Sequence, residues 1–340
     1  MFSSLNAFSE ALQDLPPANE TWRTQALARQ QQLTKPAGSL GRLEDCAVFL
    51  AGWGNVPQPR ADRMRVIVFA GSHGVTARGV SPFPPEVTAQ MVANFANGGA
   101  AINAISAACG AELEVVPLLL DAPTGDISRG PALGEGELLE ALNAGAAAVA
   151  RGGDILAFGE MGIGNTTIAA ALAARSLGGA GADWAGPGTG LGADGVAHKA
   201  GVIDEALALH AGTDRNAAGI LRYFGGREQA AIAGAVLAAR HALIPVVLDG
   251  YVVSASLAPL FRQNPDSLAH CIAGHCSAEP AHRKLLQAFG LEPLLDLRMR
   301  LGEGTGATLA LAVMRAAAVA HNNMATFAEA RVADRDGSRR

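Results

Sequence analysis

The stretch Met64-Arg65-Val66-Ile67-Val68-Phe69-Ala70 leads directly into Gly71-Ser72-His73-Gly74-Val75. After Arg65 its residues are continuously apolar, without the alternation of polar residues that marks a half-exposed strand. Such a run predicts a strand that is buried on both faces, as in a parallel sheet covered by helices. The glycine-containing segment that follows predicts a turn at the carboxyl end of this strand.

Further apolar runs of strand length alternate with segments that have helical periodicity. The predicted strands after the first are 113–119, 154–158, 244–248, 270–273 and 294–297. The predicted helices between and after them include 84–96, 100–109, 136–151, 168–176, 228–241 and 308–320. This alternation predicts an α/β fold built on a doubly wound (Rossmann-like) parallel sheet.

Both chain ends are predicted to be helical. Residues 5–34, interrupted by Pro16-Pro17, and residues 43–53 precede any strand, and the last helices fall within 316–330. We expect these segments to form a second, smaller helical domain made of residues 1–59 plus 316–335. Residues 60–315 are then the large α/β catalytic domain.

Composition and charge exclude several classes of function. The 340 residues are 49% hydrophobic and carry a formal net charge of −5, with no long run of Lys and Arg before the tail. Binding of nucleic acid depends on clustered cations, so a nucleic-acid partner is not expected. The first residues lack a signal-peptide pattern and no apolar run is long enough to span a bilayer, so we expect a cytoplasmic protein without membrane contact.

The cysteines and histidines do not predict a metal centre. Cys46, Cys109, Cys271 and Cys276 contain no Cys-x-x-Cys pair. A group at 270–282 contains three histidines and two of these cysteines, but its spacing matches no zinc pattern. Buried thiols and histidines near helix ends explain this group more simply, so neither a metal nor a cofactor is expected.

Glycine-rich segments follow the predicted strands. They are 71–74, 159–164, 249–250, 274–277 and 302–306. The carboxyl ends of parallel strands meet at one edge of the sheet, where ligands of such folds bind. One shared cleft is therefore a simpler explanation of these segments than five unrelated surface turns.

Residues 160–167, Glu-Met-Gly-Ile-Gly-Asn-Thr-Thr, connect a predicted strand to a predicted helix. Gly162, Asn165 and Thr166 are candidates to bind a phosphate at the helix N-terminus. The alternative is an ordinary capped helix start. The segment lacks the third glycine of a dinucleotide-binding fingerprint and the Gly-Lys-Ser/Thr of a phosphate-binding loop of the Walker type.

Three more segments supply candidate contacts. The glycine loop 186–192, with Gly188, Thr189 and Gly190, precedes Lys199, whose charge suits a phosphate, although a lone lysine is usually solvated. Residues 81–91 combine prolines with Ser81 and Gln90 and suit one wall of a flat heteroaromatic pocket. Ser277 is a helix cap or a ligand donor.

Glu303 lies between glycines in Gly302-Glu303-Gly304-Thr305-Gly306. A carboxylate without bulky neighbours can reach a proton on a bound small molecule, which is what a general base must do. The alternative is a solvated glutamate in a surface turn.

Taken together, the motifs resemble the nicotinate-nucleotide–dimethylbenzimidazole phosphoribosyltransferase family over nearly the whole chain. The resemblance is carried by residues 35–41 (Lys-Pro-Ala-Gly-Ser-Leu-Gly), 160–167, 188–191, 224–228, 248–251, 277–280 and 302–306. Two departures are Ser72, where the family usually has Asp, and Ala281, where it usually has Gly.

The resemblance implies transfer of the 5-phosphoribosyl group from nicotinate mononucleotide to 5,6-dimethylbenzimidazole with inversion, giving α-ribazole 5′-phosphate and nicotinate in cobalamin lower-ligand assembly. It implies Glu303 as the catalytic base and Glu160 on the ribose and phosphate side. It implies Lys199 and the 188–190 loop at the phosphate. Ser81, Gln90, Met161 and Leu301 would flank the benzimidazole. The family forms homodimers and uses no catalytic metal.

Two other functions remain open from the sequence. A nucleotide hydrolase on the same scaffold would release nicotinate without an acceptor base, because a fold does not fix a function. A non-catalytic binder of benzimidazoles or nucleotides would bind without turnover.

Overall fold

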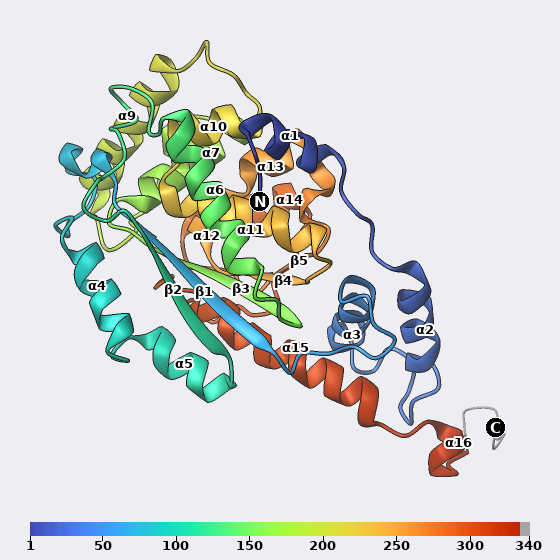
Figure 1. Cartoon of the computed structure of the whole chain (residues 1–340). Helices are drawn as coiled ribbons and strands as arrows, with labels where there is room; N and C mark the ends of the chain where they lie inside the picture. The colour runs from blue at the N-terminus through green and yellow to red at the C-terminus, as the bar shows by residue number, and fades with distance from the viewer. Residues whose placement is uncertain (334–340) are drawn as a thin grey trace.

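The computed structural model of the chain describes residues 1–333, and its centre is one sheet of five parallel strands (Figure 1). The strands are β1 Met64–Gly71, β2 Glu112–Leu118, β3 Ile155–Met161, β4 Val246–Leu248 and β5 Cys271–Ala273. Their order in the sheet is β2-β1-β3-β4-β5. The chain therefore moves from β1 to one edge and then returns to the other side of β1, which creates a switch point between β1 and β3.

Sixteen α-helices and two short 3₁₀ segments surround the sheet in the described residues. The helices are α1 Leu5–Gln13, α2 Glu20–Gln30, α3 Arg42–Trp53, α4 Val87–Ala96, α5 Ala101–Cys109, α6 Glu135–Val149, α7 Asn165–Leu177, α8 Gly181–Trp184, α9 Ala193–Leu209, α10 Ala217–Phe224, α11 Arg227–His241, α12 Tyr251–Ser256, α13 Ala258–Gln263, α14 Pro280–Phe289, α15 Thr305–Asn323 and α16 Phe327–Ala330. The 3₁₀ segments are η1 Gly74–Arg78 and η2 Pro265–Leu268.

Helices cover both faces of the sheet. Ile67 and Phe69 of β1 enter a large hydrophobic cluster with α6, α7 and α11. Val66 and Val68 of the same strand point the other way, into a second cluster with α3, α5 and α15. Since successive strand residues face opposite sides, a strand covered on both faces must be apolar throughout. The predicted α/β class with a doubly wound parallel sheet is confirmed.

The helices at the chain ends form two groups. α2 and α3 pack together around Ala26, Val48 and Ala51, and α3 also contacts α15. Arg29 of α2 donates to the carbonyls of His321, Asn322 and Met324 at the end of α15. α1 instead buries Phe8 and Leu12 in the large cluster of the α/β body.

The division into two domains therefore stays a prediction. α15 is continuous through the predicted boundary at 315–316, and residues 334–335 of the predicted small domain lie outside the described residues.

The predicted strand 294–297 is wrong as an element of the sheet. Leu295 forms only an isolated parallel bridge with His275, beyond the end of β5. Its N–H donates to Gly274 O at 3.1 Å and its carbonyl accepts from Cys276 N–H at 2.7 Å. Pro293, which precedes this segment, has no N–H with which to continue a ladder.

No helix in residues 1–333 is long and apolar enough to cross a bilayer.

Candidate active site

The carboxyl ends of β3, β4 and β5 border a cleft, together with the loops that precede α9 and α15. Its empty space is about 620 Å³, which includes solvent at the open mouth. The lining residues are Glu160, Met161, Gly162, Ile163, Asn165, Thr166, Gly188, Thr189, Gly250, Tyr251, Val252, His275, Ser277, Glu279, Arg300, Leu301 and Gly302. This is the edge at which a doubly wound sheet binds its ligand.

One corner of the cleft combines the N-terminus of α7 with a buried lysine behind it. Asn165 and Thr166 begin α7, whose N-terminus is the positive end of the helix dipole. The N–H groups of Asn165 and Thr167 donate to the Gly162 and Gly164 carbonyls. Lys199 Nζ donates to Thr166 Oγ1 and to the Gly186 carbonyl, both at 3.0 Å. Burial lowers the pKa of Lys199 to about 8, and the charge of Glu279 acts in the opposite direction. A cation beside a helix N-terminus suits an anionic group of a ligand.

Glu160, near the end of β3, is a buried acid on the cleft wall. Burial raises its pKa well above the usual range, and the charges of Asp249, Glu228 and Glu303 act in the same direction. A short hydrogen bond from Asn165 Nδ2 to Glu160 Oε2 opposes this shift. A positive charge on a ligand would favour the ionised form of Glu160.

Glu303 lies in a turn of three consecutive residues with left-handed backbone. The φ angles are +85° for Gly302, +61° for Glu303 and +81° for Gly304. Glycine adopts this conformation readily, whereas it costs an L-residue such as glutamate roughly 1–2 kcal/mol. The backbone strain of this turn is therefore concentrated at the glutamate, which the sequence predicts as the catalytic residue.

Asp249, directly after β4, holds this turn in place. Its Oδ2 accepts the Gly304 N–H at 3.1 Å and its Oδ1 accepts the Ala307 N–H at 2.9 Å. On the other side, Gly159 of β3 approaches so closely that a Cβ on it would lie 2.5 Å from the Gly304 nitrogen. The position of Glu303 thus depends on residues from β3 and from the end of β4.

The Glu303 side chain is buried, with the residue only 5% exposed. Burial raises its pKa, the Ile102 backbone N–H at the start of α5 lowers it, and the charge of Asp249 raises it. Its Oε2 has no hydrogen-bond partner in the described residues. Glu303 therefore combines the raised pKa and the free acceptor atom that a general base needs.

Most of the predicted substrate contacts line the cleft. They are Glu160, Met161, Gly162, Asn165, Thr166, Gly188, Thr189, Ser277 and Leu301. Lys199 lies one layer behind Thr166, and Glu303 directly follows Gly302 of the wall.

Four predicted contacts, Ser81, Gln90, Gly190 and Lys199, are not on the cleft wall, and neither is the predicted base Glu303. Ser81 and Gln90 flank the start of α4, which is joined to the wall by the hydrogen bond from the Ile163 N–H to Thr88 Oγ1. Ser81 and Gln90 therefore lie next to the cleft and not in its wall.

The structure also adds lining residues that the sequence did not single out as contacts. They are Ile163, Gly250, Tyr251, Val252, His275, Glu279 and Arg300. Burial raises the pKa of Glu279, while the Lys199 charge lowers it. Arg300 donates to the Gly188 carbonyl at 3.0 Å. Their position in or beside the glycine-rich segments was the available signal.

The three histidines at 270–282 contact different partners. His270 Nε2 is 3.0 Å from the Val236 carbonyl, and His282 Nδ1 accepts the Ser277 N–H at 2.8 Å. His275 Nε2 is 3.4 Å from Asp249 Oδ1. Within residues 1–333 no group of three or more His, Cys, Asp or Glu side chains is arranged to hold a metal ion.

An α/β fold with an anion-binding corner and buried carboxylates at the switch-point edge is typical of enzymes that act on a small phosphorylated substrate. A family model described as phosphoribosyltransferase matches residues 15–332. Because it covers nearly the whole chain, the match defines the class of protein.

Individual relatives specify the class further. The chain is 58% identical over 333 residues to a nicotinate-nucleotide–dimethylbenzimidazole phosphoribosyltransferase of Novosphingobium aromaticivorans, covering 98% of each. It is 53% identical to one of Mesorhizobium japonicum, covering 98% of this chain and 99% of the relative. A crystal structure of such an enzyme from Thermus thermophilus superimposes with a TM-score of 0.85 at 41% identity, covering 93% of this chain and 99% of that one. The chain belongs to the nicotinate-nucleotide–dimethylbenzimidazole phosphoribosyltransferase family, and the predicted resemblance is confirmed.

Proposed function

We propose that the chain transfers the 5-phosphoribosyl group of nicotinate mononucleotide to 5,6-dimethylbenzimidazole, with inversion at C1′. The products are α-ribazole 5′-phosphate, an intermediate for the lower ligand of cobalamin, and nicotinate. Relatives at 58% and 53% identity carry the name of this activity. The observation that carries the proposal is the proximity of an anion-binding corner to two buried carboxylates, Glu160 and Glu303.

The 5′-phosphate belongs in the corner formed by α7, the Gly188–Thr189 loop and Lys199. The positive end of a helix dipole and a buried ammonium both attract a phosphate. Lys199 Nζ is held by Thr166 and Gly186, so its position does not depend on the ligand. The electrostatic contact is therefore largely preorganised.

Glu160 faces the ribose and its departing base. Nicotinate is attached to C1′ through a positively charged ring nitrogen, and positive character develops on the ribose as this bond breaks. Both charges favour an ionised carboxylate nearby. Glu160 then gives up, on nucleotide binding, the proton that burial favours in the empty cleft.

Glu303 acts as the base. One benzimidazole nitrogen attacks C1′, the bond from C1′ to nicotinate breaks, and its electron pair returns to the nicotinate nitrogen. The second benzimidazole nitrogen then loses its proton to the Glu303 carboxylate. Ser81, Gln90, Met161 and Leu301 would flank this base, and such alignment of the reacting groups supplies much of the acceleration.

The homodimer, the cytoplasmic location and the absence of a nucleic-acid partner belong to the same proposal and rest on the family resemblance and on the charge of the chain. Sedimentation velocity of the full-length chain tests the dimer. A monomer that is fully active at assay concentration would contradict it.

Incubation with nicotinate mononucleotide and a panel of bases, with mass detection of the products, tests the reaction. We expect α-ribazole 5′-phosphate and nicotinate in equal amounts, only when 5,6-dimethylbenzimidazole or a related base is present. Release of nicotinate without an acceptor would identify a hydrolase. Binding of the nucleotide without any product would identify a non-catalytic binder.

A further inference from the structure

Two fully buried titratable side chains face each other directly behind the cleft wall. His73 follows β1, and Glu228 lies in the first turn of α11. Their side chains have 0% exposure, and His73 Nε2 is 2.6 Å from Glu228 Oε1. The proposed reaction uses neither residue.

Glycines bring this pair into contact with the backbone of the site. A Cβ on Gly162, which lines the cleft, would lie 2.8 Å from His73 Nε2 and 3.1 Å from Glu228 Oε1. A Cβ on Gly71 would lie 2.2 Å from Glu228 Oε2, and one on Gly226 would lie 2.3 Å from His73 Cε1. Because these three residues are glycines, they place no side chain between the pair and the turn that leads from Glu160 into α7.

Among residues 1–333, His73 is the one basic side chain within ion-pair distance of Glu228. Arg227, next to Glu228, donates instead to the Ala122 carbonyl and to Glu137. Neither His73 Nδ1 nor Glu228 Oε2 has a hydrogen-bond partner in the described part of the chain. A buried carboxylate without a partner is costly, and His73 is the side chain placed to provide one for Glu228.

The charge of Glu228 reaches the substrate side. Burial, followed by the charges of Asp249 and Glu228, raises the pKa of Glu160. The groups around Glu160 are therefore Asp249 after β4, Glu228 on α11, Glu303 before α15 and the Asn165 amide on α7.

We infer that His73 and Glu228 are a positioning pair for phosphoribosyl transfer, which fixes the Gly162 turn and holds a buried carboxylate behind Glu160. The pair touches no reacting atom. It acts through the backbone at Gly162 and through the charge of Glu228. This inference rests on the proposed function, because it gives Glu160 a role toward the nucleotide.

The test is the pH dependence of nicotinate mononucleotide binding, measured by titration calorimetry with the full-length protein. Glu228→Gln keeps the shape of the side chain and removes its charge. The acid limb of binding, which reports Glu160, should then move to lower pH by roughly one unit. His73→Gln should also move the acid limb, because the side chain that lies 2.6 Å from Glu228 Oε1 is lost.

Glu114→Gln, at the opposite end of the sheet, is the matched control and should leave the acid limb in place. Thermal unfolding identifies a variant that does not fold. If one of the two variants does not fold, the pH dependence of binding to the other variant decides the test. An unmoved limb in a folded variant would overturn the inference while wild-type transfer stands. Wild-type protein that binds no nucleotide would overturn the proposed function, and the inference with it.

Discussion

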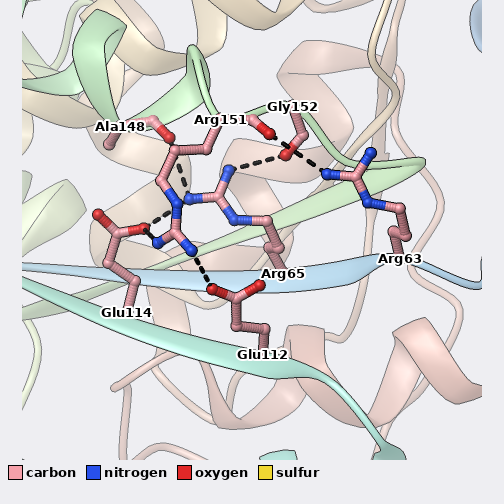
Figure 2. Close-up of polar contacts among 7 residues, drawn as sticks. All are labelled: Arg63, Arg65, Glu112, Glu114, Ala148, Arg151 and Gly152. Carbon is pink, nitrogen blue, oxygen red and sulfur yellow. Dashed lines mark hydrogen bonds and ion pairs between the residues drawn. The ribbon is translucent and has the colours of Figure 1, made fainter.

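The two ends of the sheet arrange their charged side chains in opposite ways. At the amino end, Arg65 donates to Glu114 and to the carbonyls of Ala148 and Gly152, and Arg151 donates to Glu112 and Glu114 (Figure 2). Arginines and carboxylates alternate there, so opposite charges compensate each other.

At the carboxyl end, like charges are gathered. Glu228, Asp249 and Glu303 all raise the pKa of Glu160, and several atoms of these carboxylates have no partner among the described residues. Carboxylates that raise one another's pKa in a cleft at a sheet edge indicate a site prepared for a ligand. At the amino end, ion pairs within the chain balance most of the charge, although Arg65 Nε has no hydrogen-bond partner in the described residues. The carboxyl end holds an excess of carboxylates around Glu160, which a positively charged substrate would balance. Four predictions test this contrast, in order of decreasing effect.

Glu303→Gln should have the largest effect. It removes the basic group but keeps the size of the side chain, so turnover should fall by ~10²–10⁴-fold while nucleotide binding changes little. Steady-state transfer assays and calorimetry measure the two quantities. Undiminished turnover would remove Glu303 from the base role.

Lys199→Ala should weaken the nucleotide specifically. Loss of a buried ammonium at the phosphate costs about 1.5–3 kcal/mol, so KM for nicotinate mononucleotide should rise by about 10- to 150-fold. KM for the benzimidazole should change little. Lys284→Ala, which removes a half-exposed lysine, is the control, and equal changes for both substrates would contradict the phosphate assignment.

Nucleotide affinity should depend on pH in the alkaline range. The pKa of Lys199 in the empty protein is lowered to about 8, so the ammonium that meets the phosphate is present below pH 8 and is lost above it. KM for the nucleotide should therefore rise above pH 8, by up to about tenfold per pH unit. A Lys199→Ala protein that keeps the same alkaline dependence would show that another group is responsible.

Arg151→Ala, at the amino end of the sheet, should have the smallest effect. Its side chain is 56% exposed, and exposed ion pairs contribute little to stability. Transfer activity should be unchanged, and the urea midpoint should stay close to that of the wild type. A clear loss of turnover would mean that the two ends are coupled, contrary to the comparison.

Local sequence was sufficient for most elements of the fold. The run at 64–70 became β1, and the Ala-rich segment after residue 164 became α7, because both signals lie within a few residues. The segment 294–297 was predicted as a strand because its short apolar run resembles one. Only its surroundings in the fold limit it to a single bridge.

The sequence by itself determined the family, the parallel α/β sheet and the group of motif residues that form the cleft. These features depend on periodicity and on motifs that are contiguous in the chain. The tertiary structure alone decided that Asp249 anchors the turn at Glu303, that Lys199 lies behind Thr166, and that Glu228 approaches Gly162. Each of these contacts joins residues far apart in the chain, and burial and charge at such separations arise only when the chain has folded.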